Sequence, residues 1–305
     1  MKCAYYGCLV IVQLICCSLH CQYYFSANNK TEPELLWELG ASAGAMNCLT
    51  DIGGATGKGK KFVKDINWNQ AQFGGSIFVS AAWHDQFAIR LQGSMGRIAG
   101  NDQVLKNSSG VARNRYLRNL QFRTNIKELA ITGEIYPLLI LNSRRGPSLL
   151  SPYIAGGAGF FNYTPQAWIN NTWIDLRPLH TEGEGFKEYP DRHTYSSTTW
   201  CIPVGAGIKY DAAGLINLRF EILYRITGTD YLDDVSSRYV DPALFSKYLT
   251  VAQSKLAATL ADRSAEITPG AKNNMNDIRG NANNKDAYFS FMLAASISLG
   301  RVQRK

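Results

Sequence analysis

Side chains with catalytic or metal-binding potential are few in this 305-residue chain. His193 and Ser196 form a local His/Ser pair of the kind used in nucleophilic catalysis, but no carboxylate stands where it would orient the histidine. A second group has amide, imidazole and carboxylate side chains without the spacing of a metal site: Asn170, Asn171, His180, Glu182, Glu184, Asp191 and His193. We therefore predict a protein without catalytic residues, metal ligands or a cofactor.

Other charged side chains alternate with apolar ones along the chain, most clearly in residues 217–226. Neighbouring side chains of a β-strand point to opposite faces. One face here carries Leu218, Phe220, Ile222, Tyr224 and Ile226, and the other carries Asn217, Arg219, Glu221, Leu223 and Arg225. In a water-soluble sandwich the apolar face would be the core, whereas in a membrane barrel it would face lipid and the charges would line the lumen.

Eight segments have the length and pattern of strands: residues 36–48, 70–83, 86–98, 119–141, 151–163, 194–210, 215–227 and 288–301. Short connections follow the second, fourth and sixth segments, and long ones follow the first, third, fifth and seventh. This alternation is typical of bacterial outer-membrane barrels, which have tight periplasmic turns and long external loops. An even number of strands also allows the sheet to close, so that no edge meets lipid.

The sequence thus predicts an all-β fold, an eight-stranded antiparallel up-and-down transmembrane β-barrel with long extracellular loops. An eight-stranded barrel has an interior that side chains fill. Charges in such a lumen are costly unless they pair. We therefore expect a plug of mutually paired charges rather than a diffusion pore, formed by Glu38, Arg90, Glu134, Arg219, Glu221 and Arg225.

The N-terminus has the features of an export signal. Lys2 precedes an apolar run to about Leu19, and we predict a cleaved signal peptide over residues 1–21, with the cut near Ser18 or nearer Cys21. A lipoprotein signal is the competing interpretation. Beyond it no run of eighteen apolar residues exists, which excludes helical membrane spans.

The mature chain keeps Cys48 and Cys201, which could form one bridge in an oxidising compartment or remain two small core residues.

Charge and loop composition indicate which partners to expect. The net charge of +8 is spread along the chain, and an exported protein rarely meets nucleic acid, so we predict no nucleic-acid partner. The first two long loops carry cations that would either be solvated or touch lipopolysaccharide phosphates: Lys58, Lys60, Lys61, Lys64, Arg113, Arg115 and Arg118.

The fourth long loop, residues 228–287, is predicted to contain a helix over about residues 241–262. Asp241 is a suitable N-cap and Pro242 suits the first helical position. An apolar stripe at three- and four-residue spacing follows, formed by Phe245, Leu249, Ala252, Leu256 and Leu260. Such a stripe packs either on the rest of the loop, which would cap the barrel, or on another protein.

Several segments, taken in order, resemble the PorG-like outer-membrane barrel family of the Bacteroidota. They are residues 152–161, 165–167, 176–185, 202–210 and 229–236, with 38–40 in the first strand and 279–280 before the last. The most specific is 229–236, whose motif residues are Thr229, Asp230, Tyr231, Asp233 and Asp234. His180 stands where the family more often has glycine.

The resemblance implies a non-enzymatic outer-membrane component, residues 36–305, of the type IX protein secretion system, which supports gliding motility in some relatives. It implies that the barrel anchors or organises a periplasmic ring made of a lipoprotein and a soluble subunit, within outer-membrane lipid and lipopolysaccharide. The ring would touch the periplasmic turns and tail, for which we name Asp211, Gly214, Arg301 and Arg304. The alternative is a passive structural or adhesion barrel with no role in secretion.

Overall fold

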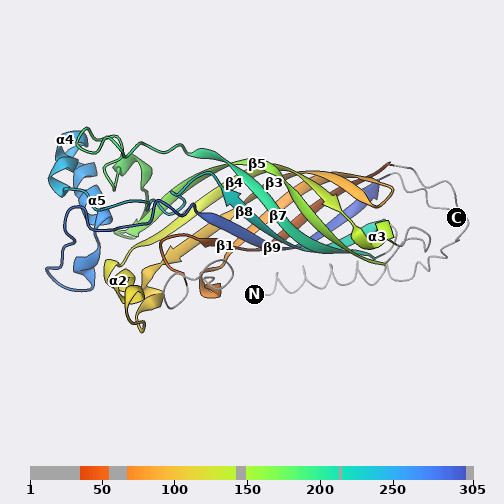
Figure 1. Cartoon of the computed structure of the whole chain (residues 1–305), viewed down its shortest axis with the longest axis horizontal. Coiled ribbons are helices and arrows are strands. Elements are labelled where there is room, and N and C mark those ends of the chain that lie inside the picture. The colour runs from red at the N-terminus through yellow and green to blue at the C-terminus, as the bar shows by residue number, and fades with distance from the viewer. Residues whose placement is uncertain (1–34, 55–66, 142–148, 213–214, 300–305) are drawn as a thin grey trace, which may run out of the picture.

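Eight antiparallel strands form a closed ring in the computed structural model, which describes residues 35–54, 67–141, 149–212 and 215–299. The pairing order is β4-β3-β2-β1-β9-β8-β7-β5, and a further pairing of β4 with β5 closes the ring (Figure 1). The strands are β1 (Leu35–Leu49), β2 (Gln72–Trp83), β3 (Phe87–Asn101), β4 (Gln121–Ile135), β5 (Leu150–Ile169), β7 (Thr198–Asp211), β8 (Ile216–Thr227) and β9 (Ala287–Leu299). The predicted eight-stranded antiparallel barrel is confirmed.

Three strand boundaries differ from the predicted ones by four residues or more. β4 ends at Ile135 rather than at residue 141, because Pro137, which lacks a backbone N–H, begins the short helix α3 (Pro137–Leu141). β5 continues past residue 163 to Ile169 and pairs there with the extra strand β6 (Thr172–Asp175), which lies outside the ring. β7 begins at Thr198 rather than at residue 194.

The outer face of the ring is apolar and exposed. Ile77 is 71% exposed, Ile89 67%, Phe160 67% and Leu293 68%, although all four are large hydrophobic side chains. The alternate residues of the same strands point inward and are buried, including every second residue of β8 from Asn217 to Arg225. The faces of β8 are therefore those expected for a membrane barrel.

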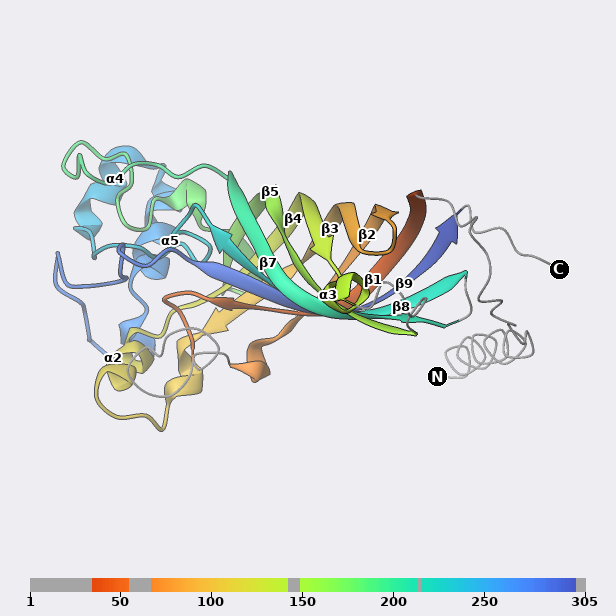
Figure 2. The ribbon, with the colours of Figure 1, turned by 45° about the vertical axis from the view of Figure 1, so that its right-hand side comes forward.

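The long connections gather at one end of the barrel, called here the loop end (Figure 1). They contain α2 (Val111–Arg118), α4 (Phe245–Tyr248) and α5 (Val251–Ala261), with the 3-10 turns η2 (Trp68–Gln70), η3 (Asp102–Leu105), η4 (Arg177–Leu179), η5 (Pro242–Leu244) and η6 (Ser264–Glu266). The opposite end, the turn end, carries α3 (Figure 1), and Figure 2 again shows α2, α4 and α5 together at the loop end. No helix among the described residues is long and apolar enough to span a membrane.

The helix predicted over about residues 241–262 is divided in the structure. Asp241 caps the turn η5, α4 stops at Tyr248, and Thr250 starts α5 with a capping box that it forms with Gln253. The break arises because Leu249 is extended, which leaves Thr250 free to act as a second N-cap. The two helices pack on residues of the β5–β7 connection, including Leu176, Leu179 and Phe186. Four residues of the apolar stripe are thus covered by this chain's own loops, namely Phe245, Leu249, Leu256 and Leu260, whereas Ala252 is exposed.

Cys48 and Cys201 are both buried and both free. They do not form the bridge that the sequence left open. The predicted signal peptide, residues 1–21, lies outside the described residues.

Candidate functional site

Five of the six predicted lumen charges form one chain of ion pairs inside the barrel. Arg219 lies between Glu38 and Glu134, with its Nη1 2.9 Å from Oε2 of Glu134. Arg90 reaches the other oxygen of Glu134, its Nε lying 3.0 Å from Oε1, and also pairs with Glu221. All five residues are buried. The charges come from β1, β3, β4 and β8, so the chain ties opposite walls of the ring together.

Arg225, the sixth predicted member, has a different partner. Its Nε lies 3.1 Å from Oε2 of Glu128, and Tyr288 donates a hydrogen bond to the same carboxylate. Glu128 was not among the charges predicted for the lumen network, although its inward position on β4 follows from the same alternation. Arg225 therefore belongs to a second ion-pair group, nearer the loop end than the first.

Sequence reasoning also missed the neutral and cationic partners of the first chain. Lys209 pairs with Glu38, Tyr136 donates a hydrogen bond to Glu134 at 2.6 Å, and Tyr153 donates one to Glu221 at 2.7 Å. The ring of Tyr153 lies over Gly207 on the neighbouring strand, where a Cβ would come within 2.5 Å of it. Filled in this way, the lumen is suited to holding the barrel rigid rather than to conducting solutes.

The motif loop, residues 229–236, is the second concentration of polar groups, and it is buried under the other loops. Oδ2 of Asp233 accepts a hydrogen bond from the backbone N–H of Ile52 at 2.9 Å, and Oδ1 accepts one from Val235 at 3.0 Å. Asp234 accepts hydrogen bonds from Thr181 and Tyr195. The aspartates thus fix neighbouring loops to one another.

Two buried arginines complete this cluster. Arg279 lies 3.0 Å from Oε1 of Glu182 and donates to the backbone oxygens of Asp234 and Ala261. Glu182 also accepts hydrogen bonds from the backbone N–H groups of residues 236 and 237. Arg118 pairs with Asp102 at 2.8 Å and donates to the backbone oxygens of residues 51 and 279. We call this cluster the loop cap: Asp51, Asp102, Arg118, Thr181, Glu182, Asp230, Asp233, Asp234, Arg279 and Asp286.

Arg118 therefore has a structural partner and is not one of the loop cations available to lipid phosphates. Arg113 remains exposed beside the ring of Tyr116, and Arg115 donates to the backbone oxygen of Gly53. The four lysines of the first long loop lie outside the described residues.

The carboxylates of the loop cap do not form a metal site. Among the residues that the structure describes, no group of three or more His, Cys, Asp or Glu side chains could hold a metal ion. The acids instead outnumber the two arginines and are held largely by backbone N–H groups. Burial raises the pKa of Asp230 to about 7 and that of Asp234 to about 6. Within the part of the chain that the structure describes, Oδ1 of Asp230 has no hydrogen-bond partner.

The loop cap is expected to lose stability as the pH rises. A carboxyl whose folded pKa is raised favours folding while it is protonated, so its contribution is complete below about pH 4 and is lost up to about pH 7 for Asp230. Hydrogen exchange of residues 229–236, measured in lipid vesicles at pH 5 and pH 8, should be faster at pH 8 after correction for the intrinsic rate. Asp230→Asn, which keeps an acceptor for Ser236, should reduce that difference. Equal corrected rates at the two pH values would contradict the prediction.

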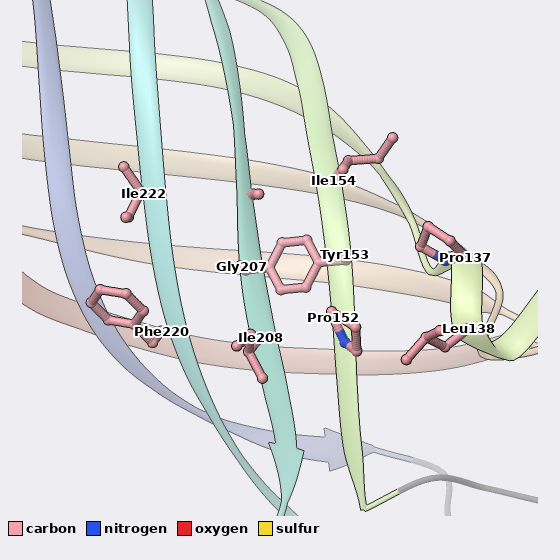
Figure 3. Close-up of a pocket in the computed structure, with 10 residues that line it drawn as sticks. Pro137, Leu138, Pro152, Tyr153, Ile154, Gly207, Ile208, Phe220 and Ile222 are labelled. Atoms are coloured by element: carbon pink, nitrogen blue, oxygen red, sulfur yellow. The ribbon is translucent and has the colours of Figure 1, made fainter. Parts of the chain in front are cut away.

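The turn end carries an apolar groove of about 440 Å³ on the outer face of the barrel. Ala206 forms its floor because it is the small residue between Ile154 and Ile222 on the adjacent strands. Leu138 of α3 extends the wall (Figure 3). Leu138 is 45% exposed and Leu141, at the end of the same helix, 79%. The groove therefore opens directly onto the membrane-facing surface.

The remaining candidate residues are dispersed. His193 and Ser196 are exposed, and no hydrogen bond joins them among the described residues; Ser196 instead accepts from the backbone N–H of Thr198. Asp211 ends β7 at the turn end. Gly214, Arg301 and Arg304 lie outside the described residues.

A closed ring of strands with an apolar outer face and a charged interior is the arrangement of a protein that spans a lipid bilayer. The fold is that of an outer-membrane barrel. Its apolar outer face meets lipid, and its lumen is filled by paired charges.

Comparisons with known proteins find similar solved structures but no relatives in sequence. No family model matches the barrel, and no curated protein matches it either. Neisserial surface protein A is 6% identical, over 86% of this chain and 97% of that one, with a TM-score of 0.37. A major outer membrane protein from Thermus thermophilus is 12% identical, over 87% and 99%, with a TM-score of 0.38. Ail, the attachment invasion locus protein of Yersinia pestis, is 8% identical, over 88% and 100%, with a TM-score of 0.35.

Proposed function

We propose that this protein is a non-enzymatic integral outer-membrane component of the type IX protein secretion system that anchors or organises the periplasmic lipoprotein ring. The observation that carries the proposal is where the segments resembling PorG-like barrels lie. Residues 176–185, 229–236 and 279–280 are far apart in sequence, yet they meet in the loop cap through Glu182, Asp234 and Arg279. Segments that resemble one family and also contact one another support a shared architecture.

Because side chains fill the lumen, a partner can contact the barrel only at its outer face and its two ends. A stable protein interface buries about 1,200–2,000 Å² in total, and the short turns at the periplasmic end offer little of that. The groove beside Leu138 and Ala206 adds apolar surface at the same end. We propose that an acyl chain of the ring lipoprotein lies in this groove while the protein part contacts the turns.

Site-specific crosslinking in cells tests this proposal. A photoreactive residue at Leu138 or Leu141 should capture the ring lipoprotein, and one at Asp211 should capture it less efficiently. The matched control is Met275, which is 56% exposed at the loop end and should not capture it. Capture of the lipoprotein from Met275 but not from α3 would overturn the proposed arrangement.

A structural or adhesion barrel is the second candidate, favoured by the ordered loop end with its own buried core. Deletion of the gene distinguishes the two. We expect loss of type IX substrates from the medium with the outer membrane intact. Normal secretion after deletion would favour the second candidate.

A further inference from the structure

The apolar outer face of the barrel ends abruptly on β3 and β4, on the side toward the loop end. Along β4 the outward residues change from Leu129, which is 60% exposed, to Lys127, two positions further. Along β3 they change from Met95, which is 68% exposed, to Arg97. Met95 and Lys127 are register partners. A row of cations thus begins where the apolar band stops.

A third cation, Arg123, lies on the same outer face of β4, four residues from Lys127. Arg97 is paired in register with Asn125, which lies between them, and donates a hydrogen bond to its side chain at 3.0 Å. Arg123 donates to Gln166 at 2.9 Å and lies 4.0 Å above the ring of Trp173. Neutral side chains therefore hold both guanidinium groups in place.

These three cations are not neutralised within the part of the chain that the structure describes. None of them forms an ion pair there, in contrast to the arginines of the lumen and the loop cap. The acidic side chain nearest in the hydrogen-bond network is Asp175, which accepts from Gln166 at 2.7 Å rather than from Arg123. Like charges on adjacent strands destabilise a protein unless an anion lies between them.

The surface next to these cations indicates which anion fits. Leu129 pairs in register with Phe160, and Phe160 pairs with Trp200, so the apolar band is continuous below the cations and ends in aromatic rings. An anion bound here would have its charge at the loop end and its apolar part along the barrel wall. The loop end faces outward in outer-membrane barrels. A lipid of the outer leaflet with phosphate groups meets both requirements.

We propose that Arg97, Arg123 and Lys127 bind the phosphates of lipid A, the phosphorylated glycolipid of lipopolysaccharide, whose acyl chains lie on Met95, Leu129 and Phe160. Lipid A carries two phosphates on a rigid disaccharide, and the three cations, on the adjacent strands β3 and β4, can contact both phosphates of one molecule. The site is separate from the loop cations considered first, and it does not depend on a role in secretion.

Lipid binding to the purified full-length protein tests this site. Native mass spectrometry would compare bisphosphorylated lipid A, fully dephosphorylated lipid A and phosphatidylglycerol. The triple variant Arg97→Gln, Arg123→Gln, Lys127→Gln should bind bisphosphorylated lipid A at least about tenfold more weakly than the parent, because each cation near a membrane surface adds appreciably to binding. The dephosphorylated form should bind parent and variant alike.

The matched control removes three exposed cations at the loop end, by Lys106→Gln, Lys255→Gln and Lys272→Gln, and should keep the parent affinity. Circular dichroism of all variants would verify that the barrel has folded. Three outcomes would overturn the site: the triple variant retains parent affinity, the control loses as much as the triple variant, or phosphatidylglycerol binds the parent as tightly as lipid A.

Discussion

Replacement of Glu134 by alanine is expected to lower the free energy of unfolding of the barrel by about 3–5 kcal/mol. Glu134 joins Arg90 and Arg219, and it also accepts from Tyr136. Its removal leaves two buried guanidinium groups with fewer partners, and the loss of a buried charge is costly because its partners remain in a medium of low dielectric constant. Denaturant-induced unfolding in lipid vesicles, followed by tryptophan fluorescence, measures the change.

Two further variants separate the ion pairs from general effects of substitution. Glu134→Gln keeps the volume and an acceptor for Tyr136, so it should destabilise the barrel less than alanine does. Glu188→Ala removes an equivalent carboxylate from an exposed pair with Lys247 and should leave the stability unchanged. A loss in Glu134→Ala no larger than that in Glu188→Ala would show that the lumen network does not hold the barrel.

Replacement of Arg279 by methionine is expected to open the loop cap while the barrel stays folded. The guanidinium of Arg279 is buried between Glu182 and the backbone oxygens of Asp234 and Ala261, and methionine leaves all three groups without this donor. We expect a loss of local stability of about 3–5 kcal/mol. Hydrogen exchange of residues 229–236 should be faster, with that of β1 to β4 unchanged.

The matched control is Arg238→Met. Arg238 is exposed and donates to one backbone oxygen, that of Asn276, so its loss should change exchange little. Uniformly faster exchange throughout the barrel in Arg279→Met would contradict the separation of cap and barrel. Unchanged exchange in the motif loop would contradict the role of Arg279.

Period-two patterning identified the barrel because every membrane strand must repeat it. One face of β8 meets lipid and the other meets the lumen along its whole length, so Leu218 to Ile226 and Asn217 to Arg225 are sorted by alternation alone. The same signal weakens where strands extend past the membrane. β5 continues to Ile169 and pairs with β6, and there its buried face, which includes Ala167, packs on the helices of the fourth long loop instead of lining the lumen.

The helix of the fourth long loop was expected to be continuous because its apolar stripe is continuous. Thr250 nevertheless starts a second helix, because its side chain accepts a hydrogen bond from the backbone N–H of Gln253 and so caps the N-terminus of α5. Capping residues inside an apolar stripe are a signal that sequence reasoning had available and did not use.

Sequence alone determined the class of fold, the number of strands and which side chains face inward, because these follow from local alternation and loop length. Only the tertiary structure decided which charges pair: Arg225 with Glu128, Arg118 with Asp102, and Arg279 with Glu182. Ion pairs form between strands and loops that are distant in sequence, and their partners depend on strand stagger and loop packing. Those quantities leave no periodic trace in the chain.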